Sequence, residues 1–153
     1  MYRYVKKMAL WAAMIFILAA CAGAPPFSDA MNRDWHLAEI RTGQESVIID
    51  RGKLAEEGFS DIFTLRFDTE RVNGIGAPNR YFAPYTLADK QGITIKTVAQ
   101  TLMLAIREPE ELKEHDYFVY LQNTAKWNLT KENLELYSQG EDGAKVVLVF
   151  APN

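Results

Sequence analysis

Cys21 is the only cysteine in the 153-residue chain, and its surroundings favour covalent chemistry at its thiol. The residues just before it, Leu18, Ala19 and Ala20, are apolar or small, so an enzyme can approach the backbone closely there. A thiolate is a nucleophile that can accept a lipid chain, and a lone cysteine has no disulfide partner within the chain. We therefore expect Cys21 to be an acylation site rather than a core residue.

The residues before Cys21 have the parts of a secretory signal peptide, which we expect to cover residues 1–20. Three basic residues lie within the first seven, and an uncharged stretch of 17 residues runs from Met8 to Ala24. The end of this stretch resembles the lipobox of bacterial lipoproteins, which implies cleavage before Cys21 and acyl chains such as palmitate on its sulfur. Two alternatives remain open: an uncleaved membrane anchor, for which the stretch is barely long enough, and ordinary export with Cys21 incidental.

The charge balance excludes some partners. Removing residues 1–20 would take three of the 17 basic residues and none of the 20 acidic ones, which leaves a net charge of −6. Such an acidic chain is a poor partner for nucleic acid. It also gains nothing from anionic lipid head groups, so its membrane attachment would depend on the acyl chains.

The rest of the chain predicts a short tether and one domain. Residues 21–33 are small and irregular, and Pro25 and Pro26 predict a semi-rigid tether. Residues 34–151 have the size of one domain. Alternating apolar residues and turn signals predict mainly antiparallel strands. The expected strands cover residues 35–40, 47–50, 62–68, 71–74, 81–87, 92–97, 126–129, 134–137 and 146–150.

Two departures from the strand pattern predict helix. Residues 100–106 predict a short helical turn, and a longer helix is expected from Pro109, placed in its first turn, to about Gln122. Pro84 within the fifth strand suggests an edge strand or a bulge, because proline lacks the N–H of a sheet ladder. Many antiparallel strands around one helix predict a small closed or nearly closed β-structure.

A series of motifs in the middle of the chain carries a family resemblance. It consists of a glycine-rich stretch that ends in asparagine, a tyrosine, an Ile-x-Ile strand and a Thr-x-Met turn. The motif residues are Asn73, Gly74, Gly76, Asn79, Tyr85, Thr101 and Met103. Together with flanking matches from about residue 34 to 150, the series resembles the META domain of HslJ-like bacterial lipoproteins. The resemblance implies a mainly β (α+β) fold, a small lipocalin-like antiparallel barrel with one helix packed against it. It also implies a place in the cell envelope and an association with stress responses.

One departure from the family pattern concerns its cysteines. Members of the family often carry cysteines in two segments where this chain has Ala77 and Ala105. Their joint absence suggests that the two segments lie close together and are packed by small side chains.

No cluster of residues points to catalysis, a metal or a cofactor. Gly74 and Gly76 do not form a phosphate-binding loop, because no helix follows them; we expect them where the backbone needs positive φ or close approach. His36 and His115 are about 80 residues apart, with no ligand spacing around them. No serine lies in a nucleophile elbow. We therefore expect a protein that is not an enzyme.

A candidate interaction surface lies at Arg80, Tyr81 and Tyr85, whose composition is that of protein-binding hot spots. Only alternate residues of a strand can be exposed, so the alternative is that this stretch is core with one edge.

The expected function is that of a non-catalytic envelope lipoprotein, anchored by Cys21, that binds an envelope protein or cell-wall partner. Ala22 after the cysteine is no acidic retention signal, which favours the outer membrane where the host has one. The first alternative is an inhibitor of a cell-wall hydrolase or protease, acting through residues 74–81 or 139–143. The second is a carrier of a small apolar ligand inside the barrel.

Overall fold

The computed structural model describes residues 24–153, so the expected signal peptide and Cys21 lie outside the described part. This part contains two α-helices, α1 (Arg51–Glu56) and α2 (Glu114–Gln122), and a short 3-10 helix (Phe27–Ala30). Its strands are β1 (Trp35–Thr42), β2 (Glu45–Ile48), β3 (Thr64–Phe67), β4 (Arg71–Ile75), β5 (Arg80–Ala88), β6 (Gly92–Ile95), β7 (Ala99–Gln100), β8 (Lys126–Leu129), β9 (Leu134–Gln139) and β10 (Lys145–Pro152).

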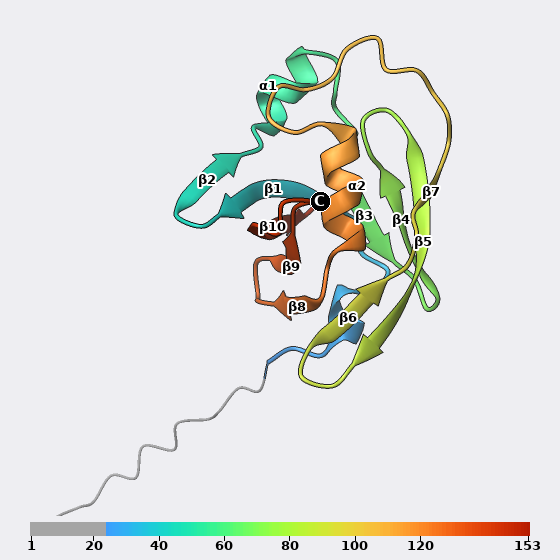
Figure 1. Cartoon of the computed structure of the whole chain (residues 1–153), viewed down its shortest axis with the longest axis vertical. Coiled ribbons are helices and arrows are strands. Elements are labelled where there is room, and N and C mark those ends of the chain that lie inside the picture. The colour runs from blue at the N-terminus through green and yellow to red at the C-terminus, as the bar shows by residue number, and fades with distance from the viewer. Residues whose placement is uncertain (1–23) are drawn as a thin grey trace, which may run out of the picture.

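Eight of these strands close into an antiparallel barrel (Figure 1). Neighbours around it follow the order β1-β3-β4-β5-β6-β8-β9-β10, and β10 pairs with β1 to complete the ring. β2 and β7 are additional strands, paired with β1 and β5. The predicted mainly β, lipocalin-like barrel with one main helix is thus confirmed.

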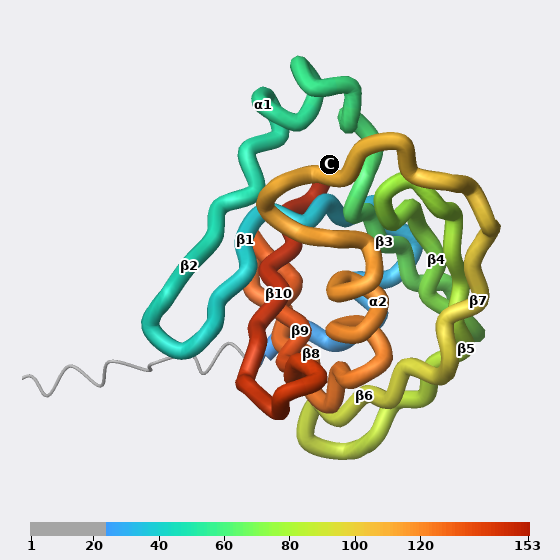
Figure 2. The backbone as a smooth tube through the Cα atoms, turned by 45° about the horizontal axis from the view of Figure 1, so that its top comes forward, coloured from blue at the N-terminus to red at the C-terminus, as the bar shows by residue number. Residues whose placement is uncertain are grey.

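The barrel interior is filled with bulky side chains. In β3, Leu65 and Phe67 point inward and are buried, while Thr64 and Arg66 alternate with them on the outside, as the sequence predicts. α2 lies in the middle of the ring of strands in Figure 2. The largest fully buried side chains include Trp35, Phe63, Phe67, Tyr117 and Phe150. An interior occupied in this way gives no support to the apolar-ligand carrier.

Pro84 marks a change of partner along β5. Residues 80–84 pair with β4, and residues 85–88 pair with β6. Proline has no N–H to donate, but the hydrogen bonding on this side continues, because the next N–H, that of Tyr85, bonds to the carbonyl of Glu70. The expectation of an edge strand is therefore wrong: β5 lies inside the barrel wall and bends from one neighbour to the other.

The helices differ from the prediction in two places. α1 is not predicted; Asp50 caps it by accepting a bond of 3.1 Å from the backbone N–H of Lys53. The guanidinium of Arg51 then ties α1 to the barrel by donating to three carbonyl groups, those of Leu37, Ile62 and Phe63. α2 begins at Glu114 rather than at Pro109, because the residues before it are held by contacts with α1, such as the 2.7 Å ion pair of Lys53 with Glu111.

The domain begins earlier than expected. Phe27 is buried, with its ring 4.9 Å from that of Phe67 and 5.0 Å from that of Trp127. Ala30 is also buried, and its carbonyl accepts a 2.9 Å bond from the indole of Trp35. The predicted tether therefore ends near residue 26 rather than 33, because aromatic burial draws the next residues into the core. Within residues 24–153 no helix has the length and apolar character needed to cross a bilayer.

Candidate functional site

The predicted interaction surface is divided between the inside and outside of the barrel. Tyr81 is only 3% exposed, and its hydroxyl donates a 2.9 Å bond to the carbonyl of Thr64. Burial raises the pKa of Tyr81 well above its usual value, so this hydroxyl stays a donor. Tyr85 is half-buried and donates to the carbonyl of Asp68 at 2.7 Å. The placement of Tyr81 on a surface was wrong, whereas Arg80 and Phe82 are exposed.

A buried hydrogen-bonded cluster lies where β4 turns into β5. Asn79 is 6% exposed, and its amide nitrogen donates to Glu114 Oε2 at 2.7 Å. The other carboxylate oxygen of Glu114 accepts the backbone N–H groups of Ala77 and Asn79. One carboxylate at the start of α2 thus satisfies three donors of the glycine-rich stretch. Glu114 was not found by sequence reasoning, because its partners are about 35 residues away.

Asn79 also fixes the chain that follows β7. Its Oδ1 accepts the hydroxyl of Thr101 at 2.8 Å and the backbone N–H of Met103 at 2.7 Å. Its Nδ2 donates to the carbonyl of Met103 at 3.3 Å. The helical turn expected over residues 100–106 is wrong, because these bonds hold the backbone to Asn79 instead. The segments with Ala77 and Ala105 therefore do run side by side.

The result is a fixed segment with unburied apolar side chains, residues 102–106, which we term the apolar segment. Leu102 is 95% exposed, Leu104 90% and Ile106 95%. Large apolar residues usually leave the surface when they can, and contiguous exposed ones mark interaction sites. Sequence reasoning missed them; the available signal was an apolar run with no polar residue to give a helix a solvent face.

Two motif glycines allow close approach and are not in the positive-φ region. A Cβ on Gly76 would lie 2.7 Å from the ring of Phe118. A Cβ on Gly74 would lie 2.8 Å from the carbonyl carbon of Thr64 and closer still to its oxygen. That oxygen accepts the hydroxyls of both Tyr81 and Tyr117, at 2.9 and 3.0 Å. Of the two reasons expected for these glycines, close approach is the one that applies.

A shallow groove lies on the outer face of β3, β4 and β5, with a volume of about 480 Å³. We term it the arginine groove, because three arginines line it: Arg66, Arg71 and Arg80. Asp34 lies 3.1 Å from the guanidinium of Arg66, and Asp68 lies 3.9 Å from that of Arg71. The groove and the apolar segment are adjacent, since the backbone of Thr101 bonds to the carbonyl of Arg80.

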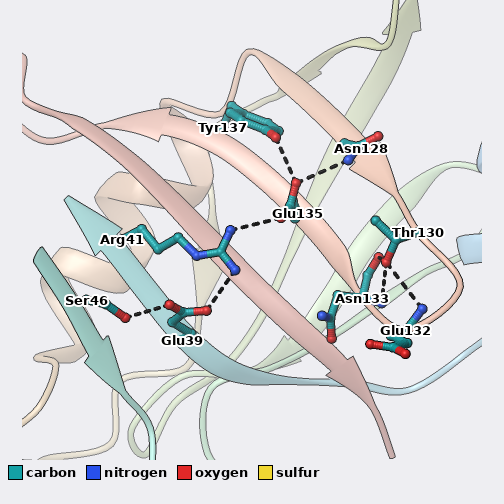
Figure 3. A network of polar contacts seen from close by, with 9 residues as sticks. All are labelled: Glu39, Arg41, Ser46, Asn128, Thr130, Glu132, Asn133, Glu135 and Tyr137. Atoms are coloured by element: carbon teal, nitrogen blue, oxygen red, sulfur yellow. Dashed lines mark hydrogen bonds and ion pairs between the residues drawn. The ribbon is translucent and has the colours of Figure 1, made fainter. Parts of the chain in front are cut away.

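A third polar arrangement crosses the outer face of β1, β9 and β8 (Figure 3). Arg41 bridges two carboxylates, at 2.8 Å from Glu39 and 3.0 Å from Glu135. Hydrogen bonds from Arg41 and Ser46 lower the pKa of Glu39. Burial opposes the change at Glu135, but bonds from Tyr137, Asn128 and Arg41 still lower the pKa of that carboxyl. Both carboxylates are therefore ionised near neutral pH, and neither suits the role of a general acid.

This bridge predicts an acid-sensitive contribution to stability. A carboxyl whose folded pKa is lowered stabilises the fold above its unfolded pKa, and the effect is lost as the pH falls through the folded value. Arg41→Gln should therefore cost about 0.5–1 kcal/mol at pH 7, and the deficit should shrink below about pH 4. Urea unfolding at both pH values measures it, with the exposed Lys96→Gln as the charge-matched control. A deficit that is the same at both pH values would contradict the assignment.

The two histidines lie apart in the fold. His36 is half-buried, and burial together with nearby Arg51 lowers its pKa. His115 is exposed and lies 3.2 Å from Glu141. Across residues 24–153, no three histidine, cysteine or acidic side chains are grouped so as to hold a metal ion.

Two loops were expected as candidates for enzyme inhibition. Residues 74–81 are mostly enclosed, since Gly76, Ala77, Asn79 and Tyr81 are buried, whereas residues 141–143 are exposed.

Comparisons with known proteins agree with this architecture. The family model described as META domain matches residues 28–152. The NMR structure of a protein from Burkholderia xenovorans is similar, with a TM-score of 0.61 and 15% identity, over 100% of this chain and 99% of that one. The crystal structure of a DUF4847 family protein from Bacteroides vulgatus has a TM-score of 0.54 and 14% identity, over 83% and 96% of the two chains. At these identities the likeness shows the fold alone. The comparison with curated proteins gives no match.

Proposed function

Because the chain belongs to the META domain family, we propose that it is a non-catalytic binding module of the bacterial envelope, lipid-anchored at Cys21. The observation that carries the binding role is the apolar segment, in which three large side chains are at least 90% exposed and which Asn79 holds at Met103. Neither the matched family nor the similar structures are described by a catalytic activity. The partner is an envelope protein.

The backbone of the apolar segment supports a particular mode of binding. Thr101 and Met103 direct their N–H groups toward β5 and Asn79. Within the described part, the N–H groups of Leu102 and Leu104 form no hydrogen bond. A segment that follows a strand and has open N–H groups and exposed apolar side chains suits the addition of a strand from another protein. The occupant we propose is an extended apolar stretch of the partner.

The position of the apolar segment favours a protein as its binding partner, rather than the bilayer that holds the anchor. The described chain begins beside β8, where Phe27 packs on Trp127 at 5.0 Å. The loop after β7 instead runs toward α1, where Arg107 bonds to the carbonyl of Glu57 at 2.8 Å (Figure 1). The two sites lie at opposite ends of the barrel, so a lipid at Cys21 would leave the apolar segment facing away from that membrane.

The binding role is tested by site-specific photocrosslinking in cells of the host. A crosslinker at Leu104 should capture one envelope protein, and the purified partner should bind the full chain directly. The variant Leu102→Ser/Leu104→Ser/Ile106→Ser should weaken that binding at least tenfold, since each buried leucine or isoleucine contributes about 1.5–3 kcal/mol. Val47→Ser/Ile48→Ser removes exposed apolar side chains on β2 and should bind normally. Equal binding by both variants would refute the role of the segment.

The anchoring half has its own measurement. Mass spectrometry of the protein purified from its native membrane should show a chain that begins at Cys21 and carries fatty acyl mass. Cys21→Ala should release the protein from membranes. A processed chain without lipid would remove the anchor from the proposal. Cys21→Ala is also tested for binding to lipid vesicles. If it binds them, and the triple serine variant does not, then the apolar segment inserts into lipid and does not bind a protein.

A further inference from the structure

The arginine groove gathers positive charge on one face of an acidic protein. In the barrel wall, Arg66 of β3 lies opposite Asn73 of β4, and Asn73 lies opposite Phe82 of β5. Arg71 is two residues before Asn73 on the same face of β4. Arg80 is two residues before Phe82 on β5. In the register of the sheet, the three arginines therefore flank Asn73.

The positive charge of the groove is only partly compensated. Three arginines gather on this face of three neighbouring strands, although residues 21–153 carry a net charge of −6. Asp34 and Asp68 offset two of the arginines. Among the described residues, Arg80 has no carboxylate within ion-pair distance, and the amide of Asn73 has no hydrogen-bond partner. The groove thus retains one uncompensated guanidinium and one open amide.

The groove also offers an apolar surface beside the charge. Phe82 is 45% exposed, and the guanidinium of Arg71 lies 5.6 Å from the centre of its ring. Gly74 lines the same groove, without a side chain of its own. Guanidinium groups match the geometry of carboxylate and phosphate oxygens, and an exposed aromatic ring can cover a sugar or another ring.

We infer that the arginine groove binds an anionic ligand, a carboxylate or phosphate group carried on a ring-bearing body that covers Phe82. Arg80 and Asn73 hold the anion, and Arg66 and Arg71 are kept in place by their aspartates. This site is independent of the apolar segment, so either can fail without the other. The ligand could be a free phosphate ester or an acidic sugar of a cell-wall polymer, since both present the same chemistry.

Heteronuclear NMR titration of the full chain in detergent micelles tests the inference. The probes are inorganic phosphate and glucuronate at constant ionic strength, with glucose as the uncharged control. Saturable shifts are expected for the side-chain amide of Asn73 and the guanidinium N–H groups of the three arginines. Arg80→Gln should weaken the affinity about tenfold, the effect of one hydrogen bond to a charged group. Lys131→Gln removes an exposed positive charge from the turn between β8 and β9 and should bind as the unmodified chain does.

Each outcome of this titration is decisive. Saturation by either anion, weakened in Arg80→Gln and unchanged in Lys131→Gln, supports the site, and the tighter probe identifies a phosphate or a carboxylate ligand. Shifts that do not saturate for either anion overturn the inference. So does saturation that both variants change equally, because a diffuse charge effect would then explain the shifts.

Discussion

Gly74→Ala is expected to lower the free energy of unfolding by roughly 3–5 kcal/mol, a large part of the stability of a small domain. The added methyl would lie 2.8 Å from the carbonyl carbon of Thr64, so the backbone of β3 or β4 must move. Moving Thr64 also weakens the hydroxyl bonds of Tyr81 and Tyr117 to its oxygen, at 2.9 and 3.0 Å. Burial raises the pKa of both tyrosines, so both hydroxyls stay protonated and still need a hydrogen-bond acceptor.

Urea unfolding followed by tryptophan fluorescence measures this effect, since Trp35 and Trp127 are both buried. Gly52→Ala is the matched control: it adds the same methyl within α1, where the nearest atom is a side-chain oxygen of Asp50 at 3.2 Å. That variant should stay within about 1 kcal/mol of the unmodified protein. Similar unfolding midpoints for the two variants would show that the approach of Thr64 to Gly74 is not a constraint.

Asn79→Ala is expected to cost about 2–4 kcal/mol, because it leaves several buried donors and acceptors without partners. The bonds lost run to Glu114, Thr101 and Met103. The loss should be local as well as global. Amide hydrogen exchange over residues 101–106 should accelerate more than in the barrel strands, since this amide holds the apolar segment in place.

Asn133→Ala provides the comparison for this prediction. Among the described residues, the side-chain amide of Asn133 forms no hydrogen bond, although its backbone groups bond to Thr130. It should therefore change neither stability nor exchange at residues 101–106. Unchanged exchange at Met103 in Asn79→Ala would mean that the apolar segment is held by something other than this amide. Partner binding should weaken in Asn79→Ala if the segment must be pre-formed.

The barrel follows from the sequence because its strands carry local signals. These signals depend only on neighbours in the chain. Examples are the alternation of Phe63, Leu65 and Phe67 and the turn before β10. The apolar segment does not, since its shape is set by a side chain about 22 residues earlier. The motif residues Asn79 and Thr101 could be recognised from sequence, but the bond between them could not.

The exposed face of β5 was the other feature beyond local reasoning. Successive side chains of a strand point to opposite faces, so one of Tyr81 and Phe82 must face inward. Because both are aromatic, the pattern alone does not decide which one. Tyr81 faces inward because its hydroxyl finds the carbonyl of Thr64 and the hydroxyl of Tyr117, at 2.9 and 3.1 Å. A phenylalanine has no polar atom to place there, so Phe82 takes the outer face beside Arg80.

The burial of Phe27 has a mechanical meaning. Phe27 is the sixth residue after Cys21, so the connecting chain spans at most about 20 Å when fully extended. With Cys21 acylated as proposed, the start of the barrel would lie within about 20 Å of the membrane surface. A pulling force on the lipid would act first on Phe27, whose ring packs against Phe67 and Trp127. The force would therefore act directly on the hydrophobic core.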